Sequence, residues 1–166
     1  MALTHARLTQ FLSETDYFGD LDLLVLSAIS SRFEVRMIST GSELFTAGDV
    51  AEAWYIIVEG SISIWGDTPG GERCLLTHLR PGDSFGELSL LEDNTRSASA
   101  VAAEASTLLR LPSAAFRRLL DDGNPAAVHL LRALAIRMSR RMHEMSDTIQ
   151  QLRDPGSPVS QTDDVL

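Results

Sequence analysis

Residues 81–100 (PGDSFGELSLLEDNTRSASA) hold the side chains of this chain best suited to chemistry, and they fit two different kinds of site. Residues 82–86 (GDSFG) match G-x-S-x-G, the sharp strand-to-helix turn that presents a nucleophilic serine, here Ser84, in hydrolases. Residues 86–88 (GEL) and 96–98 (RSA) instead provide a glycine, an acceptor and a guanidinium of the kinds that cradle a phosphate group. The two alternatives require different surroundings, so the rest of the chain discriminates between them.

The hydrolase alternative needs a general base and an orienting acid near Ser84, in a sheet whose strands are joined by crossover helices. Only His129 and His143 follow Ser84 in the sequence, and both fall in a segment that reads as a long helix. The strand-like segments around Ser84 are separated by hairpin turns rather than by helices. We therefore expect no enzyme activity, keep a serine hydrolase using Ser84 as a remote alternative, and expect Ser84 to cap the helical turn that follows it.

The phosphate alternative uses more of the residues. A short helix beginning within 85–88 would direct free backbone N–H groups at one point, and Gly86 would let the backbone approach a ligand closely. Arg96 can hold a phosphodiester through two parallel hydrogen bonds, whereas Glu87, when ionised, only accepts them and so suits a sugar hydroxyl. Residues 81–100 contain four acidic residues and one arginine. This balance favours one singly charged phosphate, bound by directed hydrogen bonds.

Composition excludes several other classes of function. The single cysteine rules out an internal disulfide, and the four histidines form no H-x-H or H-E-x-x-H pair, so no metal site is expected. No signal peptide and no run of 18 apolar residues is visible, so we expect a cytoplasmic protein without a membrane span. The net charge of −9 argues against a general polyanion binder.

The elements that must position these residues change type along the chain. Helices are expected over residues 3–13 and 20–31, the second with Asp20 as N-cap. Two-residue alternation then predicts short strands within 32–39, 43–49, 53–60, 61–67, 73–83, 98–103 and 106–111. About eight short antiparallel strands predict a mainly β fold with flanking helices, an eight-stranded jelly-roll barrel. The cup-shaped metal dioxygenase and isomerase family has a similar barrel but needs a close histidine pair, and here its strand region offers only His78.

The C-terminal third is helical. A short helix is expected over residues 113–122, stopped by Gly123, and a long one begins at Asn124-Pro125 and runs to about Arg153. Its apolar stripe repeats every seven residues, at Leu131, Met138, Met145 and Leu152, over a length of about 42 Å. This predicts pairing with a second copy, the alternative being a helix packed only on its own barrel. The organisation expected is a helical segment at 1–31, a barrel with a short helix at 32–123, a lid or dimerisation helix at 124–153 and a disordered tail at 154–166.

Residues 80–100 resemble the phosphate-binding cassette of the cyclic nucleotide-binding domain family, which includes bacterial catabolite activators and regulatory subunits of cyclic-AMP-dependent protein kinase. The G-E-L start, the arginine nine residues after the glutamate and the small residues after that arginine all match. Residues 44–65 (LFTAGDVAEAWYIIVEGSISIW) are similar to the early barrel strands of the family, with turn glycines at Gly48 and Gly60. The resemblance covers roughly residues 15–153.

The resemblance implies a role for each matching residue of the cassette. Glu87 would accept the ribose 2′-hydroxyl, and Arg96 would bind the cyclic phosphate. The backbone amides that face the phosphate would belong to Gly86, Leu88 and Ser89. Ser97 would add a phosphate or base contact, and the strand before the cassette would wall the base with Leu76 and Thr77.

The long helix resembles the dimer helix of the catabolite activators. Arg141 falls where that helix sends a guanidinium toward the ligand, and Ser146 where a hydroxyl reaches the base from the neighbouring subunit. Met145 departs from the pattern, because a threonine is expected there for the adenine amine. The resemblance therefore implies cyclic AMP or cyclic GMP without choosing between them.

These observations together predict a small sensor of cyclic AMP or cyclic GMP, with no other cofactor, that forms a homodimer through its long helix and signals to a separate partner protein. Only 13 residues follow Arg153, too few for a helix-turn-helix, so no DNA-binding domain is expected. The main alternative is the same fold without a ligand, used as a scaffold or dimerisation module.

Overall fold

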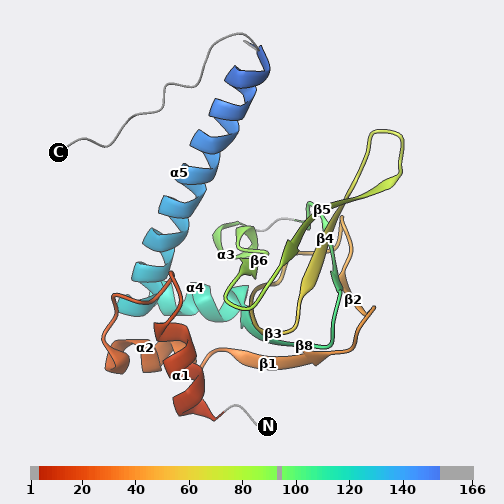
Figure 1. Cartoon of the computed structure of the whole chain (residues 1–166). Helices are drawn as coiled ribbons and strands as arrows, with labels where there is room; N and C mark the ends of the chain where they lie inside the picture. Colours follow the sequence, from red (N-terminus) through yellow and green to blue (C-terminus); the bar gives the residue numbers. More distant parts are fainter. Residues whose placement is uncertain (1–3, 93–94, 154–166) are drawn as a thin grey trace, which may run out of the picture.

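Two four-stranded antiparallel sheets form the body of the protein in the computed structural model, which describes residues 4–92 and 95–153 (Figure 1). The strands are β1 (Glu34–Ile38), β2 (Glu43–Phe45), β3 (Ala53–Glu59), β4 (Ile62–Asp67), β5 (Arg73–Leu79), β6 (Ser84–Phe85), β7 (Ser99–Ala102) and β8 (Ser106–Pro112). One sheet has the order β1-β8-β3-β6 and the other β2-β7-β4-β5. The predicted mainly β jelly-roll fold is confirmed, as two facing sheets rather than a fully closed barrel.

The central strands are buried on both faces, which explains their nearly continuous apolar sequence. In β3, Tyr55 and Ile57 face the other sheet and pack with Phe85 and Leu108 in the core between the sheets. Alternate residues of the same strand point the opposite way, so Trp54 belongs to a second core under the helices. The first sheet therefore carries apolar side chains to two cores at once.

The second core is covered by four helices, α1 (His5–Ser13), α2 (Leu23–Ser30), α4 (Ser113–Asp121) and the beginning of α5 (Pro125–Arg153). The predicted Asp20 cap is wrong. Asp22 caps α2, its carboxylate accepting a 2.8 Å hydrogen bond from the Leu24 amide. Asp20 lies in a turn closed by a 2.9 Å hydrogen bond from the Leu21 amide to the Phe18 carbonyl, and Leu21 packs against the core, so the helix begins after Asp22.

The long helix α5 begins as the sequence predicts. The Asn124 side chain accepts hydrogen bonds from the amides of Ala126 and Ala127 at 3.0 and 3.3 Å, and Gly123 before it adopts a left-handed φ of 67°. The first turns are anchored by buried residues up to Leu134, and beyond them the helix extends away from the sheets (Figure 1). The tail predicted at 154–166 lies outside the described residues. Among the described helices, none is long and apolar enough to cross a membrane.

Candidate functional site

The predicted site residues lie together in the folded chain. All of them except Ser146 line one cavity of about 330 Å³, between the β5 strand, the segment 84–98 and the side of α5. The segment 84–98 comprises β6, the one-turn helix α3 (Leu88–Leu91) and the stretch up to β7. Ser146 is exposed on α5 and does not line the cavity of its own chain.

A tight turn links β6 to α3 and positions the cassette. Gly86 adopts a φ of 77°, and a Cβ placed there would lie 2.4 Å from Arg96 Nη1 and 3.2 Å from the Ala53 carbonyl oxygen. Only glycine fits a site with this backbone conformation and this close approach. Glu87 follows as the N-cap of α3, and its side chain makes no capping bond, which leaves the carboxylate available to the cavity.

Arg96 is the most deeply buried charge of the site, with 7% of its surface exposed. Its Nη2 donates a 2.8 Å hydrogen bond to the Ala53 carbonyl, and its Nη1 a longer 3.4 Å bond to the Gly86 carbonyl. The guanidinium carbon lies 4.1 Å from the centre of the Phe45 ring, a cation–π contact. Burial lowers the pKa of Arg96 from its usual value, because removal from water disfavours the charged form.

The buried guanidinium is incompletely satisfied. Its Nε has no hydrogen-bond partner, and no carboxylate among the described residues forms an ion pair with it. A desolvated cation is costly unless it is paired, so an anion that enters the cavity gains a strong partner. The chemistry of the cavity at this point is anion recognition.

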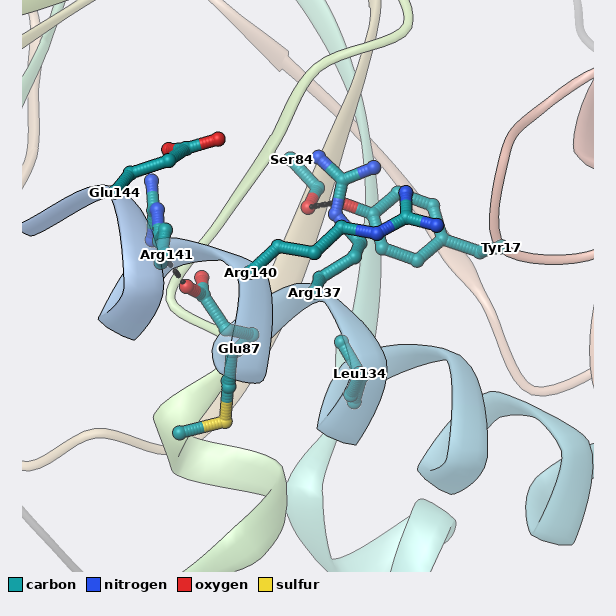
Figure 2. Close-up of a pocket in the computed structure, with 9 residues that line it drawn as sticks. Tyr17, Ser84, Glu87, Leu134, Arg137, Arg140, Arg141 and Glu144 are labelled. Atoms are coloured by element: carbon teal, nitrogen blue, oxygen red, sulfur yellow. Dashed lines mark hydrogen bonds and ion pairs between the residues drawn. The ribbon is translucent and has the colours of Figure 1, made fainter. Parts of the chain in front are cut away.

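Glu87 connects the cassette to the long helix. Its Oε1 accepts a 2.9 Å hydrogen bond from Arg141 Nη1, and the two side chains form an ion pair (Figure 2). Glu87 is 20% exposed and Arg141 is 71% exposed, so solvent screens the pair and its energy is modest. This contact places the Arg141 guanidinium beside the cassette, and its role at the ligand stays a prediction.

The remaining lining residues divide into polar and apolar groups. Ser89 donates to the Gly86 carbonyl from both its amide, at 3.2 Å, and its hydroxyl, at 2.8 Å, so its amide already has an acceptor. Ser97 is exposed at the rim. The apolar wall includes Leu76, 58% exposed on β5, next to Thr77. Sequence reasoning missed Phe45, whose contact with Arg96 joins distant segments and leaves no local signal.

Ser84 does not cap a helix, contrary to the sequence prediction. It lies in β6, and its hydroxyl forms a short hydrogen bond with the hydroxyl of Tyr17. Neither His129 nor His143 bonds to Ser84, and His143 bonds to the Ser139 carbonyl on its own helix. Neither of these histidines is therefore placed to act as the general base that a serine nucleophile requires. Over the described ranges, no group of three or more His, Cys, Asp and Glu side chains could hold a metal ion.

Comparison with known proteins identifies a family for this fold. The family model described as "Cyclic nucleotide-binding domain" matches residues 35–122. A cyclic AMP receptor protein of Thermus thermophilus is 38% identical over 118 residues, which are 69% of this chain and 51% of that protein. A regulatory subunit of cAMP-dependent protein kinase from Mycosarcoma maydis is 34% identical over 116 residues, 67% of this chain and 22% of that protein.

A solved structure gives the same result for the fold. The crystal structure of Thermus thermophilus catabolite activator protein superimposes with a TM-score of 0.72 at 32% identity, covering 82% of this chain and 63% of that one. The chain thus spans about half of the length of the Thermus receptor protein. The domain match, the relatives and the shared fold all indicate the same family. The chain belongs to the cyclic nucleotide-binding domain family, whose members here are regulatory sensor proteins.

Proposed function

We propose that this chain binds cyclic AMP or cyclic GMP in the cavity of about 330 Å³ and passes the signal through α5 to a separate partner protein. One observation carries the proposal: Arg96 is a buried guanidinium with an unpaired Nε and no carboxylate partner among the described residues, and it lines the same cavity as Glu87. A cyclic phosphate supplies the single negative charge that this guanidinium lacks.

The phosphate contacts follow from the geometry of the turn. The long bond from Arg96 Nη1 to the Gly86 carbonyl is weak at 3.4 Å, so this nitrogen can turn to a phosphate oxygen at little cost. Gly86 keeps the backbone open at that point, and the amides of Gly86 and Leu88 are the proposed backbone donors. The Ser89 amide contributes only if it shares its hydrogen with the Gly86 carbonyl. Ser97, at the rim, is the proposed additional contact to the phosphate or the base.

The sugar contact is assigned to Glu87. Its carboxylate has two oxygens, and Oε1 is occupied by Arg141. A carboxylate that already accepts from one cation still has lone pairs for the ribose 2′-hydroxyl. Arg141 then holds the carboxylate in place, and α5 is linked to the ligand through this pair.

The base is assigned to the apolar end of the cavity. Leu76 and Thr77 of β5 provide one wall. Apolar pocket surface of this kind favours contact with a flat heterocycle over contact with water. Ser146 does not line the cavity of its own chain, so its proposed base contact requires a second copy. Homodimerisation through α5 is supported by its exposed apolar residues, among them Met142 and Met145, 69% and 65% exposed.

Calorimetric titration of the full chain with cyclic AMP, cyclic GMP and linear 5′-AMP tests the proposal. A saturable heat is expected with at least one cyclic nucleotide, and weaker binding of 5′-AMP, because a linear phosphate carries more charge and does not fit the same turn. Flat heats with both cyclic nucleotides up to about 100 μM would contradict the proposal and favour a ligand-free scaffold of the same fold.

A further inference from the structure

A second cavity, of about 290 Å³, lies against the other side of the Glu87–Arg141 pair (Figure 2). Ser84, Glu87 and Arg141 line both cavities, which places the Glu87–Arg141 ion pair at the boundary. Tyr17 and Arg140 line the second cavity and not the nucleotide cavity. The second cavity is thus enclosed by the N-terminal segment, β6 and α5, and the cassette assignments do not use most of its residues.

A pair of hydroxyl groups forms the inner end of this cavity. Tyr17 is 3% exposed, its ring packs edge-on against Trp54 with centroids 4.9 Å apart, and its hydroxyl bonds to Ser84. Each hydroxyl has one proton, and the bond between them uses only one of the two. The other proton is available to an acceptor in the cavity. Burial raises the pKa of Tyr17, so its hydroxyl stays protonated at neutral pH.

Three arginines of α5 line the outer part. Arg137, Arg140 and Arg141 stand three and four residues apart, so their side chains leave the helix on one face (Figure 2). Arg137 lies over the Tyr17 ring at 4.6 Å and reaches the exposed carboxylate of Asp16 at 3.4 Å. Arg140 forms no hydrogen bond or ion pair with any described residue. Arg140 and the free hydroxyl proton are therefore the donors left for a ligand in this cavity.

The available donors and the size of the cavity define the ligand class. Arg141 is paired with Glu87 and Arg137 with Asp16, and Glu144 also lines the wall, so Arg140 is the guanidinium that has no bonded carboxylate among the described residues. The volume is at the low end of the range for ligand pockets. We propose that this cavity binds a small oxyanion, a phosphate or a carboxylate, at a site separate from the cyclic nucleotide.

Nuclear magnetic resonance titration of the full chain tests this assignment, with inorganic phosphate and succinate as the two probes. We expect saturable shifts of the Tyr17, Ser84 and 137–141 amides with one probe or both, and the probe that saturates at lower concentration identifies the group preferred. Arg140→Gln should weaken that binding about tenfold, because a charged hydrogen bond is lost. Tyr17→Phe, which keeps the ring contacts, should weaken it about fivefold.

The matched control is Arg132→Gln. Arg132 is exposed on the same helix and does not line this cavity, and its replacement changes the net charge equally. The inference is wrong if neither probe gives saturable shifts, if shifts are confined to residues 86–98, or if Arg132→Gln weakens binding as much as Arg140→Gln. Cyclic nucleotide titrated into the same sample reports on the other cavity. A failure of cyclic nucleotide to bind and a failure of the oxyanion to bind are therefore observed separately.

Discussion

At the scale of single residues, Gly86 and Arg96 constrain each other. The guanidinium occupies the space that a side chain at position 86 would fill, so the turn and the buried charge depend on one another. A buried cation without a counter-ion lowers the stability of the ligand-free protein, and an anionic ligand removes that cost when it binds. The site is therefore arranged so that ligand binding and stabilisation coincide.

Replacement of Gly86 by alanine tests this arrangement. The new Cβ would clash with Arg96 Nη1 at 2.4 Å, so the guanidinium must move away from its place in the cavity. We expect cyclic nucleotide affinity to fall at least about tenfold, a loss of about 1.4 kcal/mol. Gly71→Ala is the control, since Gly71 also has a positive φ, 80°, but a Cβ there meets no atom within 4 Å. Equal affinities of the two variants would contradict the geometry.

Glu87 should discriminate the ribose. Wild-type protein should bind the cyclic nucleotide about tenfold more tightly than its 2′-deoxy analogue, since the carboxylate loses a charged hydrogen bond with the analogue. Glu87→Gln should bind both with similar, weakened affinity. Competition with a fluorescent analogue measures the affinities of the two proteins for the two nucleotides. An unchanged preference for the 2′-hydroxyl in Glu87→Gln would show that Glu87 does not bind the sugar.

Ser84 should be chemically inert. Its hydroxyl is bonded to Tyr17 and has no histidine base, so an organophosphonate probe should not label it. Ser84→Ala should bind the nucleotide almost normally by calorimetry. Covalent labelling of the wild-type protein that is lost in Ser84→Ala would contradict this prediction and support the hydrolase alternative.

At the scale of elements, α5 has two different halves. Its first turns are buried on the core, up to Leu134, whereas Met142, Met145 and Ile149 are exposed. The ion pair of Arg141 with Glu87 joins the cassette to the outer half. A ligand shifts a conformation only by its differential affinity for two states, and an element tied to the site by a screened ion pair has the freedom to respond.

Hydrogen exchange should locate the response in this element. Cyclic nucleotide should lower amide exchange in residues 125–153 as well as in 84–98, because the ligand adds contacts to Glu87 and Arg141 at once. Peptides from β1, the edge strand of the first sheet, and from its neighbour β8 serve as the internal control and should change little. Protection confined to 84–98 would show that α5 takes no part in the response.

The elements themselves were largely predictable, and the contacts between them were not. Alternation gave the strands because half-buried sheets impose a period of two, and Asn124-Pro125 gave the start of α5 because capping is local. Asp22 rather than Asp20 caps α2, and the tertiary packing of Leu21 between them is not visible in the local sequence pattern. Gly86, Glu87 and Arg96 were predicted from their chemistry and the other cassette residues from the family resemblance. Phe45 under Arg96 and Tyr17 against Ser84 join distant segments and have no spacing signal.

At the scale of the whole molecule, the exposed apolar residues of α5 predict association. Three large apolar side chains in the outer half, Met142, Met145 and Ile149, are each more than half exposed, and such a face is usually covered by a partner. A second copy of the same helix would match the heptad spacing and would bring its own Ser146 toward this chain. We therefore predict that the chain forms a homodimer through α5.

Two acidic substitutions on that face test the dimer. Met142→Glu with Ile149→Glu should give a monomer by light scattering, because carboxylates buried in an apolar interface are unpaired. His143→Glu with Gln150→Glu is the control, since each position lies one residue, about 100°, further round the helix. A dimer that survives the first pair, or a wild-type chain that is monomeric throughout, would contradict the assignment.

In the proposed mode of binding, Arg96 holds the phosphate of the cyclic nucleotide. The most direct test of this contact is the ratio of cyclic nucleotide affinities of Arg96→Ala and wild type, measured by calorimetry on samples whose folding is verified by thermal melting. Arg110→Ala is the control, because Arg110 is also largely buried, on β8, but pairs with Glu34 and does not line the cavity. Loss of a desolvated charged pair is worth about 2–5 kcal/mol, so the account predicts a loss of roughly 30-fold to several-thousand-fold for Arg96→Ala and little change for the control. An affinity of Arg96→Ala within about threefold of wild type, a difference of about 0.7 kcal/mol, would contradict it.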